Sequence, residues 1–441
     1  MSLSNHIKYQ WNVSLLGKTA LRFDRMKKTF FPANTESWTR DGLTPPLAAA
    51  LYSKEMVSQH YLKGNFANLT HKVVWVTSGA PVEFLKALDF TIHYPENHAA
   101  VCGTVRQVEL IASEAEALGY SRDICSYSRT DIGAVVSGIT PVGKLPRPDL
   151  LLACTNICQT VLQWYRVLAE HFKVPLILID TPFIYDEAEK HSINYVQTQL
   201  EEAIGIAEKV AGKSLKMSRF QQVTQYAQQA SFLWAEILNS AKHQPAPLSV
   251  FDQFIQMAPI VEMRGDAATV DFYARMLKEV NTRVSNGVGA VIKERKRLLW
   301  DNLPIWFKMR WLAGFFGRNG IVISASTYTN AWAELAAMFD PQHPLESSAM
   351  TYLHPILNRG TGHKLKTMRK MISDYHLDGA ILHSDRSCKP YSIGQMDQRD
   401  ALFQDPGIPA ILMEADHNDP RSYSEEQSVT RLQAFVEMLE D

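Results

Sequence analysis

The sequence lacks any apolar run that approaches the roughly 18 residues needed to cross a bilayer. Its first residues, MSLSNHIKYQWNVSLL, have neither the apolar core nor the small-residue cleavage site of a secretory signal. An excess of either charge is also missing, because 45 lysines and arginines oppose 46 aspartates and glutamates. We therefore expect a cytoplasmic protein that binds neither membranes nor nucleic acid.

Two nucleotide-binding motifs are missing as well. No G-x-G-x-x-G follows a predicted strand, and no G-x-x-x-x-G-K-[ST] is present. These absences argue against a dinucleotide-binding enzyme and against a P-loop enzyme. If ATP drives the reaction, we expect another protein to hydrolyse it.

Cysteine is scarce: the 441 residues contain five, namely Cys102, Cys125, Cys154, Cys158 and Cys388. An odd number of cysteines in a long chain without a secretory signal argues against a disulfide framework. Taken singly, each cysteine is interpreted as a small buried hydrophobic residue, since cysteine is among the most buried residue types.

Short apolar runs separated by helical patterns predict an α/β fold. Six runs predict buried parallel strands: 73–77, 150–154, 176–180, 321–325, 380–383 and 411–414. Helices are expected over 104–118, 195–211, 217–238 and 269–297. We predict a helical N-terminal region (1–70), two doubly wound parallel-sheet domains (71–192 and 317–441) and a helical insertion between them (193–316).

Three of the cysteines lie near the ends of predicted strands or in the loops that follow. Cys125 lies in RDICSYSRTDIG, Cys158 in LLLACTNICQTVLQWY and Cys388 in HSDRSCKPYSIGQ. Ligands of open parallel sheets bind at this edge. Three thiolates can hold an iron–sulfur cluster and leave one iron open. The spacing matches no compact ferredoxin run, so spacing alone leaves ordinary buried cysteines as the alternative.

These segments, with YPENHAAVCG (94–103) and EADHNDPRSYSEEQ (414–427), resemble the 2-hydroxyacyl-CoA dehydratase and benzoyl-CoA reductase subunit family. The resemblance runs from about Val73 to Met438. It implies a D-component-like subunit that binds a 4Fe-4S cluster through Cys125, Cys158 and Cys388. Cys102 and Cys154 are then extra, and five cysteines are too few for the double-cubane variant of the cluster.

The resemblance also implies two catalytic residues, Ser78 and Glu96. Ser78 precedes Gly79 and Pro81, where we expect a helix to begin, and its hydroxyl and nearby N–H groups could stabilise a thioester oxyanion. The alternative is that Ser78 is only a helix N-cap. Glu96 corresponds to the family's catalytic carboxylate, with a pKa that burial would raise. A surface or N-cap glutamate is the alternative.

Six further residues lie beside these positions and are interpreted as supporting groups: His98, Arg129, Lys389, Tyr391, Asp419 and Arg421. We expect His98 and Arg129 to be structural hydrogen-bonding groups. Lys389 and Tyr391 adjoin a cluster ligand and could tune it. Asp419 and Arg421 are expected to hold their loop in place.

The chemistry implied by the resemblance is radical dehydration of a 2-hydroxyacyl-CoA to a 2-enoyl-CoA. A ferredoxin-like donor and an ATP-hydrolysing iron–sulfur activator would supply one electron, which passes through the cluster to the thioester. The ketyl radical then expels the 2-hydroxyl, a carboxylate removes the β-proton, and the electron returns to the cluster, which leaves the 2-enoyl-CoA. The open iron can polarise a substrate oxygen. The partner subunit is a paralogue or a second copy. Two alternatives are a benzoyl-CoA reductase subunit and a non-catalytic subunit that holds a partner's cluster; Ser78 favours dehydration.

Overall fold

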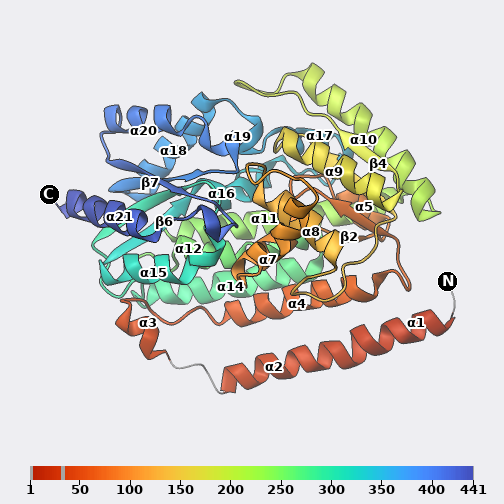
Figure 1. Cartoon of the computed structure of the whole chain (residues 1–441), viewed down its shortest axis with the longest axis horizontal. Helices are drawn as coiled ribbons and strands as arrows, with labels where there is room; N and C mark the ends of the chain where they lie inside the picture. The colour runs from red at the N-terminus through yellow and green to blue at the C-terminus, as the bar shows by residue number, and fades with distance from the viewer. Residues whose placement is uncertain (1–2, 31–34, 441) are drawn as a thin grey trace.

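Two four-stranded parallel sheets form the framework of the protein, as expected for an α/β fold (Figure 1). The structure is a computed structural model that describes residues 3–30 and 35–440. The first sheet contains β1 (Val73–Val76), β2 (Thr91–His93), β3 (Leu150–Cys154) and β4 (Leu176–Ile179). The second contains β5 (Lys296–Asp301), β6 (Ile321–Ser326), β7 (Gly379–Asp385) and β8 (Ala410–Ala415). Residues 1–2 and 31–34 of the predicted N-terminal region lie outside the described residues.

Both sheets have the same doubly wound topology. The strand order is β2-β1-β3-β4 in the first sheet and β6-β5-β7-β8 in the second. In each sheet the chain adds one strand on one side of its first strand and then crosses to the other side. The direction of winding therefore reverses between β1 and β3, and again between β5 and β7. Crevices open at such reversal points, at the carboxyl ends of the strands.

The strands form because their side chains are buried on both faces. Val73–Val76 and Leu150–Cys154 are fully buried along their lengths. Val74 pairs with Leu150 and Val76 with Leu152, so the two central strands of the first sheet are in register. Near-continuous apolar strands of this kind are typical of parallel sheets covered by helices.

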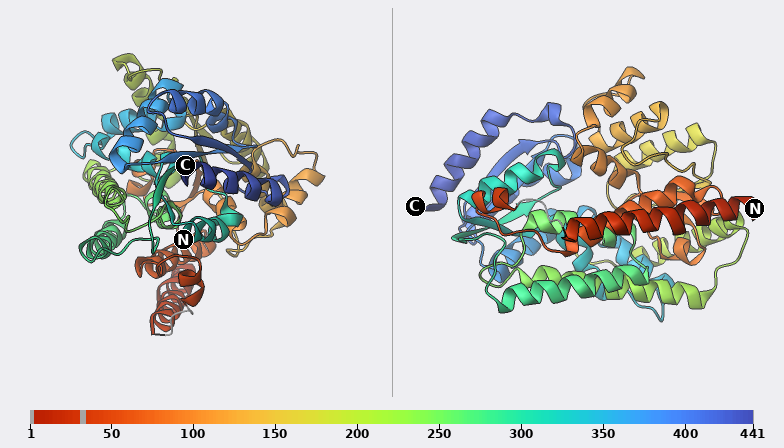
Figure 2. Two further views of the ribbon diagram at one scale, coloured as in Figure 1. Left: turned by 90° about the vertical axis from the view of Figure 1, so that its left-hand side faces the viewer. Right: turned by 90° about the horizontal axis from the view of Figure 1, so that it is seen from below.

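Helices surround the two sheets (Figures 1 and 2). The N-terminal region contains α1 (Leu3–Tyr9), η1 (Gln10–Gly17), α2 (Lys18–Phe30), α3 (Glu36–Arg40) and α4 (Ala49–Ala67). Between β1 and β4, the chain forms the helices α5 (Glu83–Ala87), α6 (Pro95–Thr104), α7 (Val108–Ala117), α8 (Ser126–Ser137) and α9 (Gln159–Phe172). Within residues 3–30 and 35–440, each helix is too short or too polar to cross a bilayer.

The helices between the sheets are α10 (Lys190–Ala211), α11 (Met217–Ser240), α12 (Val250–Gln256), α13 (Ala258–Glu262) and α14 (Ala267–Ser285). The second sheet is accompanied by η2 (Trp306–Lys308), α15 (Met309–Arg318), α16 (Thr327–Glu334), η3 (Ala336–Met338), α17 (Pro344–Leu353), η4 (Ile356–Asn358), α18 (Thr361–Tyr375), α19 (Lys389–Ser392), α20 (Gln395–Gln404), η5 (Pro420–Ser422) and α21 (Glu425–Glu440). In Figure 1, α1 and α2 run along the lower edge of the molecule.

Three predicted elements were wrong in their bounds or in kind. The helix predicted over 269–297 ends at Ser285, and Lys296–Asp301 forms β5, a central strand of the second sheet. The segment 193–316 is therefore not purely helical, and the second sheet begins before residue 317. The helix predicted over 104–118 is α7, which begins at Val108. The sequence patterns also gave no indication of β2, which has only three residues, too few to show a periodic pattern.

An ion-pair network centred on the buried Arg129 connects α7 and α8 to the loop after β8. Nη1 of Arg129 on α8 donates to Glu116 Oε1 at 2.6 Å and to Asp419 Oδ2 at 2.9 Å. Arg421 donates to the same two carboxylates. The structural roles predicted for Arg129, Asp419 and Arg421 agree with these contacts. The network holds α7, α8 and the C-terminal loop together.

Candidate functional site

A cavity of about 1410 Å³ lies where the carboxyl ends of strands from both sheets meet. Ser78 follows β1 and Cys158 follows β3, while Leu303 follows β5 and Cys388 follows β7, and all four line the cavity. The cavity therefore lies at the points where the direction of winding reverses in the two sheets, and ligand crevices are expected there. Residues of the N-terminal helix α4 close another side.

The three predicted ligand cysteines all line this cavity and are free thiols. Each one occupies the N-cap position of a helix: Cys125 of α8, Cys158 of α9 and Cys388 of α19. The Cys158 thiol accepts hydrogen bonds from the N–H groups of Thr160 and Val161. The Tyr391 N–H contacts the Cys388 thiol in the same way. Such N–H groups stabilise negative charge on sulfur.

The cysteines are close enough to influence one another's ionisation. Burial raises the pKa of Cys158 to about 11, and a neighbouring Cys125 thiolate adds to this rise. Burial also raises the pKa of Cys388 well above its usual value, with further contributions from Asp385, Cys125 and Cys158. The raised pKa values of Cys158 and Cys388 favour neutral thiols, and a metal cation bound to them would favour the thiolate forms.

Local contacts hold Cys125 and Cys388 near each other although 263 positions separate them in the chain. The N–H of Ser126 donates to Ser387 Oγ at 3.2 Å, and the two hydroxyls lie 3.3 Å apart. Asp385 Oδ1 accepts from the N–H groups of Ser387 and Cys388. The turn after β7 is therefore fastened to the start of α8.

A buried histidine lies beside Cys125. His417 Nδ1 contacts Asp385 Oδ2 at 2.7 Å, and the ring also hydrogen-bonds the Cys125 side chain. Burial alone would lower the pKa of His417, but Asp385 and Asp416 outweigh it and hold the pKa well above its usual value. The ring is thus a buried cation beside the Cys125 side chain.

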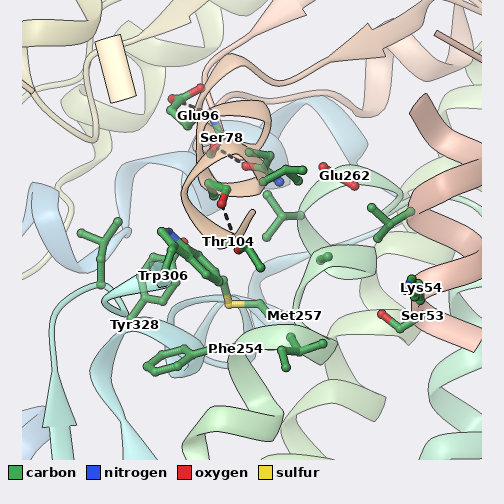
Figure 3. Close-up of a pocket in the computed structure, with 18 of the residues that line it drawn as sticks. Ser53, Lys54, Ser78, Glu96, Thr104, Phe254, Met257, Glu262, Trp306 and Tyr328 are labelled. Carbon is green, nitrogen blue, oxygen red and sulfur yellow. Dashed lines mark hydrogen bonds between the residues drawn. The ribbon is translucent and has the colours of Figure 1, made fainter. Parts of the chain in front are cut away.

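Ser78 and Glu96 are in direct contact on one wall of the cavity (Figure 3). The N–H of Ser78 donates to Glu96 Oε1 at 3.0 Å, and the Tyr165 hydroxyl lies 3.5 Å from Oε2. Burial raises the pKa of Glu96 to about 7, although these hydrogen bonds partly oppose the rise. Glu96 is therefore a buried carboxyl in the first turn of α6, which excludes the surface alternative.

The loop after β1 differs from the expected helix start. The helix α5 begins at Glu83 with Val82 as its N-cap, so Ser78 does not cap a helix. Instead, Gly79 lets this loop pack tightly against the loop after β3, since a Cβ on Gly79 would lie 2.8 Å from Ile157 and 2.9 Å from Asn156. Asn156 Nδ2 donates to the Gly79 carbonyl at 2.9 Å. This close approach brings Ser78 toward the loop that carries Cys158.

A second buried carboxyl lies on the same wall. The Ser78 hydroxyl donates to Asn97 Oδ1 at 3.0 Å, and Asn97 hydrogen-bonds Glu262. Glu262 Oε1 also accepts from the Tyr61 hydroxyl at 3.1 Å. Burial raises the pKa of Glu262 to about 7. The rest of the nearby surface is apolar and aromatic, with Phe254, Met257, Trp306 and Tyr328 grouped together (Figure 3).

The other predicted residues lie apart from the cavity or only adjoin it. Cys102 and Cys154 are buried in the protein core and are absent from the cavity lining. His98 is buried behind Glu96, with Nε2 2.9 Å from the Thr140 hydroxyl. Lys389 donates to the Arg386 carbonyl, whereas Tyr391 lines the cavity and its hydroxyl lies 2.7 Å from Thr327 Oγ1.

Sequence patterns alone missed several residues of the site, chiefly Asp385, Asp416, His417 and Glu262. Asp385 ends β7, and Asp416 and His417 follow β8, so the strand-end rule already used for the cysteines could have found them. Glu262 ends α13 in a segment without a recognisable motif. Only the packing of α13 against the N-terminal helix α4 places Glu262 at the cavity.

The donor set at the cavity fits an iron–sulfur cluster. Three free thiols from distant segments line one buried space, with N–H donors at two sulfurs and a cationic imidazole at the third. Cluster sulfurs are commonly stabilised by such hydrogen bonds. Cys125, Cys158 and Cys388 are the residues that would hold the group.

Comparison with known proteins finds subunits of acyl-CoA dehydratases and of a benzoyl-CoA reductase. The (R)-2-hydroxyisocaproyl-CoA dehydratase alpha subunit of Clostridioides difficile is 32% identical over 376 residues, covering 84% of this chain and 90% of the relative. The (R)-phenyllactyl-CoA dehydratase alpha subunit of Clostridium sporogenes is 29% identical over 371 residues, covering 83% of this chain and 89% of the relative. A benzoyl-CoA reductase subunit of Thauera aromatica is 29% identical over 403 residues, covering 88% and 93%.

A family model covers almost the whole chain after the N-terminal helices. The family described as 2-hydroxyglutaryl-CoA dehydratase, D-component, matches residues 77–439. The matched region contains both sheets apart from β1, all five cysteines, Ser78 and Glu96. The chain is thus an enzyme subunit that belongs to the 2-hydroxyglutaryl-CoA dehydratase D-component family.

Proposed function

We propose that this chain is the iron–sulfur subunit of a radical 2-hydroxyacyl-CoA dehydratase. The observation that carries the proposal is that Cys125, Cys158 and Cys388 line the same cavity as the Ser78–Glu96 pair. A 4Fe-4S cluster on these thiols would supply one low-potential electron to a thioester bound in the cavity. The product would be a 2-enoyl-CoA, formed through a ketyl radical.

The chain's own residues would handle the oxygen and the proton. The Ser78 hydroxyl can turn from Asn97 toward a thioester oxygen and stabilise negative charge there. Glu96, once ionised, would accept the β-proton, since its pKa of about 7 is suited to proton transfer near neutral pH. The apolar walls exclude water and strengthen both interactions.

The cavity supports an apolar or aromatic acyl group as substrate. Phe254, Trp306 and Tyr328 would surround such a group. An acyl chain that ends in a carboxylate would be desolvated near Glu262, and two neighbouring carboxyl groups resist joint ionisation. We infer a higher kcat/KM for 2-hydroxyisocaproyl-CoA than for 2-hydroxyglutaryl-CoA.

We propose three protein partners that this chain requires. A second subunit, either a paralogue or another copy of this chain, would complete the enzyme, because the relatives are named as subunits. An ATP-hydrolysing iron–sulfur activator and a ferredoxin-like donor would deliver the electron, since the sequence has no ATP-binding motif. A cytoplasmic location suits these partners.

The alternative is reduction of benzoyl-CoA, which the relative from Thauera aromatica supports. Dehydration returns its electron after each turnover, whereas ring reduction consumes electrons. The test measures ATP hydrolysed per product formed, with the second subunit, activator and reductant present, on 2-hydroxyacyl-CoA and benzoyl-CoA substrates. We expect many dehydrations per activation. A fixed ATP requirement for each benzoyl-CoA reduced would overturn the dehydratase proposal and favour the alternative.

A further inference from the structure

Behind Glu96, three buried side chains from three different elements face one another. His93 ends β2, His98 lies on α6 and Asp131 lies on α8. Their exposed fractions are 3%, 0% and 0%. One ligand atom from each of the three lies within 4.8 Å of the others. None of the three belongs to the cavity lining.

Each of these side chains has one atom without a hydrogen-bond partner in the described part of the chain: His93 Nε2, His98 Nδ1 and Asp131 Oδ1. A buried polar atom without a partner loses its hydration without gaining a hydrogen bond, so it is energetically costly and uncommon in native proteins. Three such side chains, with a ligand atom of each within 4.8 Å of the others, therefore point to a shared ligand rather than to three separate packing defects.

The remaining polar atoms of two of these side chains are held in place. His98 Nε2 lies 2.9 Å from Thr140 Oγ1, and Asp131 Oδ2 accepts from the Trp164 indole N–H at 2.9 Å. When His98 Nε2 donates to Thr140, Nδ1 carries a lone pair and can only accept. This division, with one atom anchored by a neighbour and the other free, is typical of residues that ligate a metal.

The ligand chemistry favours a cation over a water molecule. When His98 Nε2 donates to Thr140 and Asp131 is ionised, the unpartnered atoms of both residues are acceptors, and neutral His93 can present a third lone pair. A water molecule has only two hydrogens to donate, whereas a metal ion accepts lone pairs from all three atoms.

The burial of the group leads to the same conclusion, because a fully buried carboxylate needs a compensating positive charge. Neutral imidazoles are the form that binds metals. A divalent cation would also compensate the charge of the buried Asp131 carboxylate, which otherwise has only the Trp164 indole as hydrogen-bond donor among the described residues.

We propose that His93, His98 and Asp131 bind one divalent transition-metal ion, namely zinc, at a structural site separate from the three-cysteine centre. Two imidazoles and one carboxylate are a nitrogen and oxygen donor set that zinc accepts. The ion would link β2, α6 and α8. Because Glu96 lies on α6 and Cys125 caps α8, the site would hold the base and a cluster ligand in fixed relation.

The first experiment measures metal content and zinc ligation in the wild-type holoenzyme, purified anaerobically from zinc-supplemented medium. We expect about one zinc per chain in addition to the iron of the cluster, by mass spectrometry of the elements. Zinc-edge X-ray absorption should show only nitrogen and oxygen neighbours, at about 2.0–2.2 Å. The absence of zinc would overturn the proposal. So would zinc–sulfur distances of about 2.3 Å, because they would place the zinc on cysteines.

The second experiment uses variants. Asp131→Asn and His98→Gln should each lose most of the zinc and keep the iron. Cys102→Ala is the matched control, because Cys102 lies one helical turn from His98 and contacts its opposite nitrogen, Nε2. This variant should keep the zinc, and Cys388→Ala should lose iron but keep zinc. Full zinc content in Asp131→Asn would refute the ligand set. If that variant fails to fold, the zinc-edge X-ray absorption spectrum of the wild-type enzyme still tests whether the zinc has nitrogen and oxygen ligands.

Discussion

The backbone N–H of Ser78 donates a hydrogen bond of 3.0 Å to the carboxylate of Glu96, across 18 positions of sequence. The contact joins the loop after β1 to the first turn of α6. It places the proposed oxyanion donor and the proposed base on one wall of the cavity. Because the backbone makes this bond, changing the side chain of Ser78 leaves it intact.

Replacing Glu96 with Gln should lower the rate of dehydration by about 10²- to 10⁴-fold, the usual contribution of a positioned acid–base group. The amide cannot accept the β-proton but has nearly the same shape. Iron content should stay at the wild-type level, which separates loss of the base from loss of the cluster. A normal rate in Glu96→Gln would remove Glu96 from the mechanism.

The rate should also depend on pH through Glu96. Its pKa is about 7, raised by burial from an ordinary value of 4.5. A base must be ionised, so the rate should rise as the pH increases through about 7 and fall below it. A pH–rate profile of the wild-type enzyme checks this. The fall in rate below about pH 7 should be absent from the residual activity of Glu96→Gln. If the same fall in rate persists in that variant, the titration belongs to another group.

Ser78→Ala should slow the reaction less than Glu96→Gln does. The loss of one oxyanion donor costs about 3–4 kcal/mol at most, and the Ser78 N–H bond to Glu96 remains. We expect kcat to fall with little change in KM, since the hydroxyl acts mainly on charge that develops in the transition state. Steady-state kinetics measures both constants. A loss confined to KM would indicate a role in ground-state binding only.

Single alanine variants of Cys125, Cys158 and Cys388 should each lose most of the iron of the anaerobically purified protein, because three thiolates hold the proposed cluster. Cys102→Ala and Cys154→Ala should keep it, since both residues are buried away from the cavity. Iron analysis and electron paramagnetic resonance after reduction are the measurements. Full iron retention in Cys388→Ala would refute the ligand assignment.

Arg129→Met should destabilise the folded protein by about 3 kcal/mol or more, because it leaves buried carboxylates without one of their cations. The control is Lys213→Met, which removes an exposed pair with Asp89 and should change stability by less than about 1 kcal/mol. Thermal unfolding of both variants beside the wild type gives the comparison. Equal unfolding temperatures for the two variants would show that the Arg129 network contributes no more than a surface pair.

The α/β class and most of the strands follow from local patterns of the sequence. Residues 150–154, for example, form β3 with the bounds that their apolar run predicts. A parallel strand covered on both faces needs apolar side chains at every position, so its signal is local. The quoted motifs around Cys158 and Cys388 likewise indicated the family before any fold was known.

Which residues meet depends instead on long-range packing. Residues 296–301 look like the end of a helical segment. They form the strand β5 because they pair with β6 on one side and with β7 on the other. Ser78 looks like a helix cap, but close packing of the Gly79 loop on Asn156 and Ile157 turns it toward Glu96 instead. Glu262 and the His93–His98–Asp131 group carry no signal of their own. Their chemistry depends on burial and on partners far away in sequence, which a local pattern does not contain.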